Sequence, residues 1–350
     1  MRIWKRLLAL MLLLCFVQGA QAESAFGFSP VRTYEGARYE ARPPAETTTV
    51  LLIGYDHHQE GMQTELHGYS GGGQADFLLL VVLDHRTDEI RMLQIDRDTM
   101  ARVRVTDARG YEHDRSSLQI CLSHAYGNTR EKNNANTVLA VETLLGIEGA
   151  DDGAQIDWYV AMDISGIARL NDLLGGVTLT MQTDMTDIDP AMTAGATLTL
   201  TGRQAERFCR GRYGVGDQTN ASRMLRQQQY ITAASQQLVQ LLRQDVGEGV
   251  RLLDGMGLLH DATVRVTGPF DFSDSVSGTP TGDARGHYLM TNALRATIVS
   301  DLGRAAIYSL GEIETLPGVH SLGSDGYIRF DMQQDAALRW ALDVFYDNID

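Results

Sequence analysis

Short apolar runs alternate with stretches of helical periodicity along most of the chain. Uninterrupted apolar runs predict buried strands at 47–54, 76–84, 90–96, 158–163 and 177–181, with a weaker candidate at 263–268. Helical spacing of apolar positions predicts helices at 136–146, 165–174 and 223–243, and in LRWALDVFYDN near the end of the chain. This alternation predicts an α/β protein whose sheet is covered on both faces. We find no repeat, low-complexity tract or linker after residue 45, so we expect one domain over residues 47–350.

The N-terminus has the layout of a secretory signal. A basic segment precedes an apolar run from Leu7 to Val17, and Ala20-Gln21-Ala22 supplies small residues for cleavage after Ala22. Residues 1–22 are thus expected to be a signal peptide, with an uncleaved membrane anchor as the alternative and a lipoprotein signal as a weaker one. All three place the body outside the cytoplasm. Residues 23–46 contain prolines before any regular pattern begins, and we expect them to form an extended leader.

Composition and net charge limit the kinds of molecule that this protein is expected to bind. The chain has 350 residues, is 43% hydrophobic and 21% charged, and carries a formal net charge of −15. Residues 1–22 hold three basic residues and no acidic one, so their removal changes this charge to −18. Nucleic-acid binding needs a broad basic face, so we exclude nucleic acid as a partner and direct DNA contact as a regulatory mechanism. Beyond the signal, Cys121 and Cys209 either form a disulfide or remain buried free thiols.

Two carboxylates follow the pattern of a metal site. Asp56 comes directly after the first strand and Asp76 begins the second. If these strands are neighbours, the two side chains meet at one edge of the sheet and offer oxygen ligands to Mg²⁺ or Mn²⁺. The alternative is that both residues merely form turns or caps, as aspartates at strand ends often do.

A cluster of basic residues predicts an anionic ligand. Arg210 and Arg212 have strand spacing in FCRGRYG, while Arg223 and Arg226 have helical spacing in SRMLRQQQ. Asp217, Asn220 and Gln227 extend this cluster, and Arg97-Asp98 follows the third strand. Converging guanidinium groups suit phosphate or pyrophosphate. The alternative is a solvated, arginine-rich face, although Phe208 and Cys209 indicate a half-buried strand around Arg210.

Other common chemistries find no support. His57, His58 and His124 have no partner at the spacing of a nucleophile–base pair or a metal site. The chain contains no G-x-S-x-G elbow and no G-x-x-x-x-G-K-[ST] phosphate loop.

Seven blocks, in order, resemble the LytR–CpsA–Psr family of extracytoplasmic glycopolymer transferases. They are LLIGYD, QADFLLLVVLD, MLQIDRDT, HAYGN, LLGGVTL, TLTGRQAERFCRGR and DQTNASRMLRQQQY. The resemblance implies a single-domain α/β/α sandwich with a central mixed sheet and an apolar tunnel for a polyprenyl chain. It also implies transfer of a glycopolymer phosphate from undecaprenyl pyrophosphate to peptidoglycan at the outer face of the cell membrane.

By this resemblance, Asp56 and Asp76 hold Mg²⁺. The arginines that bind the pyrophosphate are Arg97, Arg210, Arg212 and Arg223, and the residues expected at the lipid pyrophosphate headgroup are Gln74, Asp217 and Gln227. Asp98 and Asp217 are candidates to accept the proton of the attacking hydroxyl group. The helical stripe Ile164, Ile167, Leu170 and Leu174 is expected to be core rather than lipid contact.

The chain departs from the family pattern at two positions. Gln74 stands where the family usually has arginine, and Gln119 stands where it usually has lysine. Two cations are therefore missing from a site expected to handle a dianionic leaving group. This motivates an alternative function, a polyprenyl-pyrophosphate binding or sensing protein without turnover.

Overall fold

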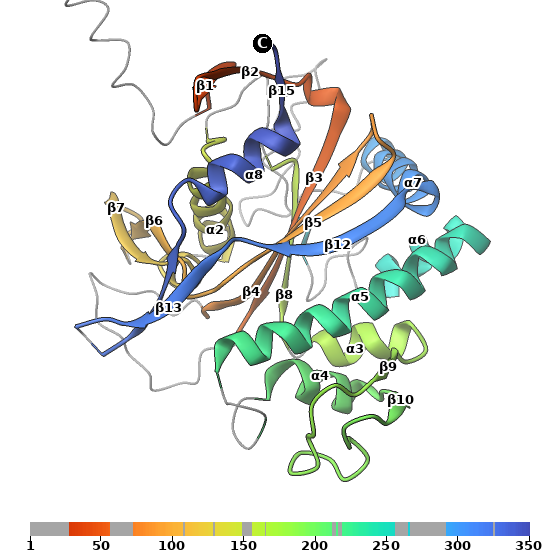
Figure 1. The fold of residues 1–350 in the computed structure, drawn as a ribbon. Coiled ribbons are helices and arrows are strands. Elements are labelled where there is room, and N and C mark those ends of the chain that lie inside the picture. The colour runs from red at the N-terminus through yellow and green to blue at the C-terminus, as the bar shows by residue number, and fades with distance from the viewer. Residues whose placement is uncertain are drawn as a thin grey trace, which may run out of the picture.

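A mixed six-stranded sheet forms the centre of the computed structural model (Figure 1). The structure describes residues 28–56, 73–107, 109–128, 130–148, 156–164, 166–211, 215, 219–255, 265–266, 292–324 and 326–350. In sheet order the strands are β11 (Arg265–Val266), β8 (Trp158–Asp163), β3 (Thr47–Tyr55), β4 (Ala75–Asp84), β5 (Glu89–Ile95) and β12 (Ser309–Thr315). β3 pairs in parallel with β8, and β5 with β12, whereas the remaining neighbours are antiparallel.

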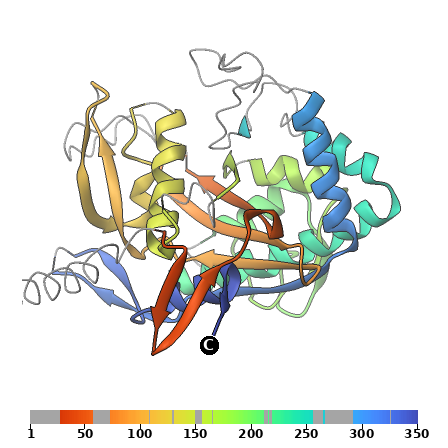
Figure 2. The ribbon, with the colours of Figure 1, turned by 90° about the horizontal axis from the view of Figure 1, so that it is seen from above.

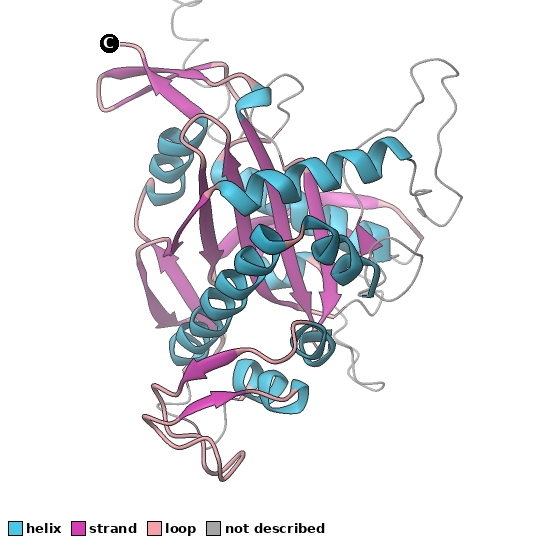
Figure 3. Cartoon of the chain, turned by 90° about the vertical axis from the view of Figure 1, so that its right-hand side faces the viewer, coloured by secondary structure: helices cyan, strands magenta, loops and turns pink. Residues whose placement is uncertain are grey.

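Helices cover both faces of this sheet because its central strands are apolar on both sides. Leu78 and Leu80 of β4 belong to a core cluster that includes α2 (Arg130–Leu145) and α8 (Ala336–Phe345). The alternate residues Leu79 and Leu83 belong to a cluster with residues of α5 (Asn220–Gln244) and with Tyr308 after α7 (Asn292–Ile307). Figure 2 shows α2 and α7 on opposite sides of the sheet, and Figure 3 shows α5 crossing one face. The predicted α/β/α sandwich is confirmed.

The remaining helices lie on the α5 side. They are α3 (Gly166–Leu173), α4 (Gly202–Arg210) and α6 (Val246–Gly255), and two short 3₁₀ turns occur at Pro44–Glu46 and Ile120–Ser123. The helices predicted near 136–146, 165–174 and 223–243 correspond to α2, α3 and α5. Gly146 ends α2 with a φ of +70°, the left-handed conformation that glycine adopts at helix C-termini.

Short antiparallel ribbons surround the central sheet. They are β6 (Met100–Thr106) with β7 (Glu112–Gln119), β9 (Thr178–Thr180) with β10 (Thr197–Thr199), and β13 (Gly318–Leu322) with β14 (Ile328–Met332). A three-stranded sheet joins β1 (Val31–Tyr34) and β2 (Ala37–Ala41) to the C-terminal β15 (Tyr346–Asn348). The expectation of an extended leader is therefore wrong for residues 31–41, whose hairpin pairs with the end of the chain.

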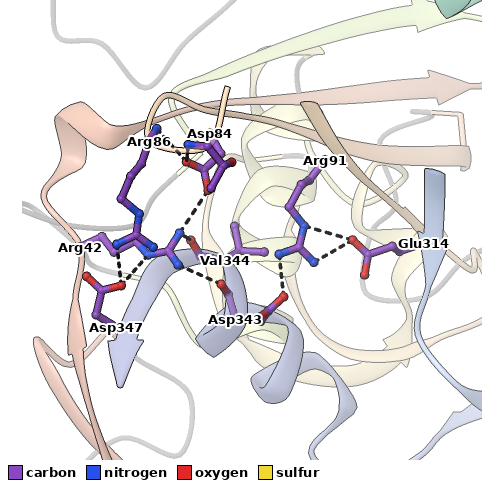
Figure 4. Close-up of polar contacts among 9 residues, drawn as sticks. Arg42, Asp84, Arg86, Arg91, Glu314, Asp343, Val344 and Asp347 are labelled. Atoms are coloured by element: carbon purple, nitrogen blue, oxygen red, sulfur yellow. Dashed lines mark hydrogen bonds and ion pairs between the residues drawn. The ribbon is translucent and has the colours of Figure 1, made fainter. Parts of the chain in front are cut away.

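Ion pairs fasten the C-terminal elements to the sheet (Figure 4). Arg42 lies 3.2 Å from the buried Asp84 at the end of β4, and it also donates to the Val344 carbonyl oxygen at the end of α8 (2.7 Å). Arg91 of β5 joins Glu314 of β12 (2.9 Å) and Asp343 of α8 (2.6 Å). These contacts fix α8 against the sheet at the edge opposite Asp76, because Asp84 and Asp76 stand at the two ends of β4.

Candidate active site

Asp56 and Asp76 lie at the same edge of the central sheet, where β3 ends and β4 begins. The register of the two strands shifts between Gly54 and Tyr55, and Asp76 is the residue left over in the resulting β-bulge. Bulges redirect side chains and are common beside active sites. Past the bulge, the backbone N–H of Asp56 donates to the carbonyl oxygen of Gln74 (2.9 Å). The strands are neighbours, as the predicted metal pair requires.

Gly73 permits this close passage of the chain beside Asp56. A Cβ atom at Gly73 would lie 1.4 Å from the Asp56 carbonyl oxygen, so no other residue fits this backbone. The Gly73 carbonyl oxygen is also 2.7 Å from Nδ1 of His124, whose ring stacks on Tyr55 with centroids 4.5 Å apart. His124, which had no partner in the sequence pattern, thus helps to position the backbone next to Asp56.

Arg97 connects the two strand ends with the turn after β5. Its guanidinium group donates to the Asp76 carboxylate and to the side-chain oxygen of Gln74. Nε lies 3.4 Å from Oδ1 of Asp98, and Nη2 lies 3.4 Å from Sγ of Cys121. A planar guanidinium group held on several sides is fixed in orientation before any ligand arrives.

The first turns of α5 supply the second arginine of the site. The helix begins after Thr219, whose hydroxyl oxygen accepts from the Ser222 N–H (3.1 Å). Nη1 of the buried Arg223 lies 3.5 Å from Oδ2 of Asp76, and Nη2 donates to Oδ1 of Asn220 (2.6 Å). Two guanidinium groups therefore meet at the Asp76 carboxylate.

Arg210 lies on a helix, and the predicted strand around it is wrong. Thr201 and Gln204 form a capping box at the start of α4, which continues to Arg210. Phe208 and Cys209 are buried because they face the core from this helix. The i, i+2 spacing of arginines in FCRGR therefore does not reflect a strand.

The Arg210 side chain lies beside the first carboxylate. Its Nη2 is 3.6 Å from Oδ1 of Asp56, and its Nη1 donates to Glu206, one helical turn back (3.0 Å). With 43% of its side chain exposed, Arg210 forms a solvent-facing margin of the site. Arg212 and Asp217, predicted for the same cluster, lie outside the described residues.

Arg226 has a different role from Arg223, although both were grouped on one side of the predicted helix. Buried Arg226 donates to the carbonyl oxygens of Phe208 (3.2 Å) and Gly211 at the end of α4. These bonds satisfy carbonyl groups that a helix terminus leaves without internal partners. We therefore infer that Arg226 holds the end of α4 against α5.

Gln227 lies one turn further along α5 than Arg223, where it meets Gln94 of β5. Nε2 of Gln94 donates to Oε1 of Gln227 (3.2 Å), and Gln227 donates weakly to the Cys209 carbonyl oxygen (3.4 Å). Both amides are buried. Gln94 was not foreseen, because a glutamine inside an apolar strand carries no motif.

Two further residues that no sequence motif singled out, Asp96 and His320, lie beside Asp98. Asp96 is buried and accepts from Nδ2 of Asn220 (3.0 Å), and Nε2 of His320 lies 2.9 Å from its other oxygen. Asp98 accepts from Nε2 of Gln119 (3.0 Å), so both positions that depart from the family pattern, Gln74 and Gln119, border the site. Burial raises the pKa of the Asp98 carboxyl group, while nearby Arg97 opposes the shift.

Cys121 and Cys209 are both buried free thiols, so the disulfide alternative is wrong. Burial raises the pKa of both thiols, which keeps them protonated and unreactive. Cys121 packs against Arg97, and Cys209 lines an apolar cavity.

An apolar cavity of about 130 Å³ lies between the sheet and helices α3 and α5. Its walls include Leu52, Phe77, Val160 and Met162 from the sheet and Ile167, Leu170, Tyr230 and Ile231 from the helix side. Gln227 also lines it, one turn from Arg223, so the cavity begins next to the polar site. Of the stripe expected to be core, Ile164, Ile167 and Leu170 border the cavity, and Leu174 is core.

Residues 28–245 match the family model of the LytR_cpsA_psr family, which is more than half of the chain. The chain belongs to this family. The match includes every described residue assigned to the site except His320.

Among its relatives, the chain is 26% identical over 221 residues to a polyisoprenyl-teichoic acid–peptidoglycan teichoic acid transferase, TagU, of Halalkalibacterium halodurans. It is 24% identical over 203 residues to biofilm regulatory protein A of Streptococcus mutans. These matches cover 59% and 55% of this chain and 62% and 44% of the relatives, so part of each relative's length has no counterpart here.

Solved structures share the fold at low sequence identity. Protein gbs0355 from Streptococcus agalactiae aligns with a TM-score of 0.59 at 16% identity, covering 87% of this chain and 91% of that one. TagT bound to LI-WTA aligns with a TM-score of 0.56 at 18% identity, covering 92% and 96%. TagV of Bacillus subtilis gives 0.55 at 17% identity, covering 85% and 98%. These likenesses show a common fold.

No described helix combines the length and apolar character needed to cross a bilayer. Residues 1–22, with the predicted signal or anchor, lie outside the described part of the chain.

Proposed function

We propose that the protein is an extracytoplasmic transferase that moves a glycopolymer phosphate from a polyprenyl-pyrophosphate carrier to peptidoglycan. The observation that carries this proposal is the meeting of Arg97 and Arg223 at Asp76, one helical turn from an apolar cavity. A lipid pyrophosphate has the matching composition, with a dianionic head and an apolar tail. The relatives' names, which include a transferase acting on polyisoprenyl-linked teichoic acid, support the same substrate class.

The residues at the sheet edge fit a divalent cation. The described site contains the carboxylates of Asp56, Asp76, Asp96 and Asp98 and the guanidinium groups of Arg97, Arg210 and Arg223. Carboxylates thus outnumber guanidinium groups before an anionic substrate binds, and oxygen donors suit Mg²⁺ or Mn²⁺. In this proposal Asp56 and Asp76 hold the ion, which would neutralise charge on the pyrophosphate oxygens.

The protein's own groups would act mainly through position and charge. Arg97 and Arg223 are already oriented by Gln74, Asp98 and Asn220, so little reorganisation is required when negative charge develops on the leaving lipid phosphate. Arg210, at the solvent side, would contact the pyrophosphate or its sugar-linked phosphate. The apolar cavity would receive the first part of the prenyl chain and so fix the scissile bond relative to the arginines.

The decisive experiment measures release of polyprenyl phosphate by the full-length chain. The donor is a synthetic polyprenyl-pyrophosphate-linked disaccharide, the acceptor is peptidoglycan oligomers, and the reaction is run with Mg²⁺, with Mn²⁺ or with a chelator. We expect metal-dependent release, and we expect Asp76→Asn to lower kcat/KM by about 100-fold or more, as loss of a transition-state contact does in other enzymes.

A matched control lies at the other end of the same strand. Asp84 is also buried and also paired with arginine, with Nη1 of Arg42 at 3.2 Å. Asp84→Asn should therefore lower stability to a similar degree and leave transfer by the folded fraction unchanged. Equal loss of activity in both variants would contradict the assignment of Asp76 to the site.

A binding or sensing function is the second candidate, and Gln74 and Gln119 favour it. Gln74 meets Arg97 and Gln119 meets Asp98, so two neutral amides occupy the site where the family usually has cations. The same assay separates the two functions. A sensor would bind the donor with metal-dependent affinity and release no polyprenyl phosphate, and restoring Gln74→Arg with Gln119→Lys would then create turnover.

We also propose that residues 1–22 export the chain and are cleaved after Ala22. Export would place the site at the outer face of the cell membrane, where such donors are exposed. N-terminal sequencing of the exported protein tests this. A chain that starts at Glu23 supports cleavage, and a chain that retains Met1 supports the membrane anchor.

A further inference from the structure

His320 forms a hydrogen-bonded dyad with Asp96 beside the proposed transferase site. Nε2 of His320 lies 2.9 Å from Oδ2 of Asp96, and donor atoms of Asp96, Asp98 and His320 all lie within 4.8 Å of one another. No motif in the sequence links these residues, and the family match ends before His320.

The C-terminal hairpin delivers His320 to this position. Phe330 of β14 pairs with His320 of β13, and the backbone N–H of Phe330 donates to the Asp98 carbonyl oxygen (2.8 Å). The two rings also pack together, with centroids 5.0 Å apart. The hairpin is therefore joined to the turn that carries Arg97, and this contact places His320 beside Asp96.

Asp96 is fixed in the geometry of an orienting carboxylate. Its Oδ1 accepts from the Asp98 N–H (2.8 Å) and from Nδ2 of Asn220 (3.0 Å), which leaves Oδ2 for His320. Asp96 is only 7% exposed, and its three donors compensate the burial of its charge. A carboxylate that accepts from Nε2–H selects the imidazole tautomer with its lone pair on Nδ1.

The dyad is connected to the proposed metal pair by a short chain of contacts. Asn220 donates to Asp96 and accepts from Arg223, and Arg223 reaches Asp76 at 3.5 Å. The same small network thus holds the proton-accepting tautomer of His320 and one of the arginines expected to face the leaving phosphate.

Asp98, the other described candidate for the proton acceptor, has a less suitable environment. Its Oδ1 accepts from Gln119 and lies 3.4 Å from Nε of Arg97, and the residue is 7% exposed. The His320 side chain is 29% exposed, while one of its nitrogens is held inside. A general base must be reached by the incoming hydroxyl group, which His320 permits more readily than Asp98.

We propose that His320 is the general base of the transfer reaction and that Asp96 positions it. This inference rests on the proposed transferase function. The acceptor hydroxyl oxygen forms a bond to the glycosyl-linked phosphorus, and its proton passes to Nδ1 of His320. The phosphoanhydride bond breaks at the same phosphorus, and polyprenyl phosphate leaves with the electron pair. His320 then returns its proton to solvent.

The test compares the full-length protein with His320→Gln, using the synthetic donor and peptidoglycan oligomers. General-base catalysis contributes about 100- to 10,000-fold, so we expect kcat to fall by about 100-fold or more while the donor Kd stays within about threefold. In the wild type, kcat should fall on acidification as the imidazole becomes protonated, and this dependence should vanish in the variant. Added imidazole should restore part of the activity of His320→Ala.

The pH profile must be interpreted with the charged groups around the imidazole. Asp96 and Asp98 face the imidazole from the turn after β5, with Arg97 between them in sequence. Arg223 lies behind Asn220 on α5. On the facing strand, Arg329 and Asp331 flank Phe330.

The matched control is His113→Gln. His113 also faces an aspartate, with Nε2 3.5 Å from Asp107, and it lies near the start of β7, whereas Gln119, which borders the site, ends that strand. Its loss should leave both kcat and the pH profile unchanged.

The outcomes are distinct. If the wild type transfers and His320→Gln transfers equally well, or retains the acid dependence, the base assignment is wrong and the proposed function stands. If His320→Gln loses donor affinity as strongly as kcat, His320 only supports the arginine network and the assignment also fails. If the wild type binds the donor without releasing polyprenyl phosphate under any metal condition, the transferase proposal itself fails.

Discussion

Glu142 on α2 should make the stability of the protein depend on pH in an unusual direction. Its carboxyl group is part-buried and accepts from the Ile156 N–H (3.2 Å). Burial is the main cause that raises the pKa of Glu142 from 4.5 to about 7, and nearby Glu148 and Asp157 add to it. The folded protein therefore binds a proton that the unfolded chain has already lost between these pH values.

The sign and size of the effect follow from linkage. A raised pKa in the folded state means that stability falls as pH rises from about 4.5 to about 7. Each pKa unit corresponds to about 1.4 kcal/mol, so the penalty above pH 7 is roughly 3 kcal/mol. Glu142→Gln keeps an acceptor for the Ile156 N–H and carries no charge in either state. The variant should match the wild type near pH 4.5 and be more stable by up to roughly 3 kcal/mol at pH 8.

Urea unfolding of both proteins from pH 4.5 to 8.5 measures this difference. Glu112→Gln serves as a control of opposite sign, because the bond from Lys132 lowers the pKa of Glu112. That variant should be less stable than the wild type throughout this range, and the difference should shrink only when the pH is taken below about 4.5, the ordinary pKa of the group. A Glu142→Gln difference that is independent of pH, or a wild type that is the more stable protein at pH 8, would refute the reasoning.

Transfer activity should be unaffected by Glu142→Gln, because Ile156 precedes the end of β8 that lies farthest from Asp56. β3 and β8 run in parallel, with Val50 opposite Trp158 and Tyr55 opposite Asp163. The variant would then provide a more stable protein with an unchanged site.

Two further predictions concern residues near the site. Gly73→Ala should weaken metal-dependent donor binding by about tenfold or more, because the new Cβ would overlap the Asp56 carbonyl oxygen. In Gly303→Ala the new Cβ meets no atom within 4 Å, so this variant should stabilise helix α7 by about 1 kcal/mol. Both variants are examined by donor titration and by urea unfolding, and equal effects of the two substitutions would contradict the steric argument. Arg226→Met should lower the free energy of unfolding by about 2 kcal/mol or more, since it leaves buried carbonyl oxygens at the end of α4 unsatisfied. Arg223→Met should instead abolish donor binding, and similar donor affinities in the two variants would show that Arg223 is not at the substrate.

The regular elements could be predicted from the sequence because their signals are local. β3, β4 and β5 are uninterrupted apolar runs, and α5 has helical spacing over many turns. The same local logic failed at α4, where the spacing of Arg210 and Arg212 was given more weight than the capping box of Thr201 and Gln204. The start signal of the helix was present in the sequence, and the arginine spacing carried no structural information.

The site was predictable only as far as its residues follow strand ends. Asp56, Asp76 and Arg97 do so, and the antiparallel pairing of neighbouring strands brings them together. The different roles of Arg223 and Arg226 depend on which partner each meets across α5, and the helical period places both on one side without deciding between them.

The sequence by itself determined the α/β class, the positions of the central strands and the residues that border the proposed metal pair, because apolar periodicity and strand ends act over a few residues. Only the tertiary structure decided that the N-terminal hairpin pairs with β15, that the cysteines remain apart and that His320 meets Asp96. These contacts join segments far apart in the chain, and their formation depends on the register of the C-terminal hairpin and the packing of α8 against the sheet. No local pattern of residues records such a register.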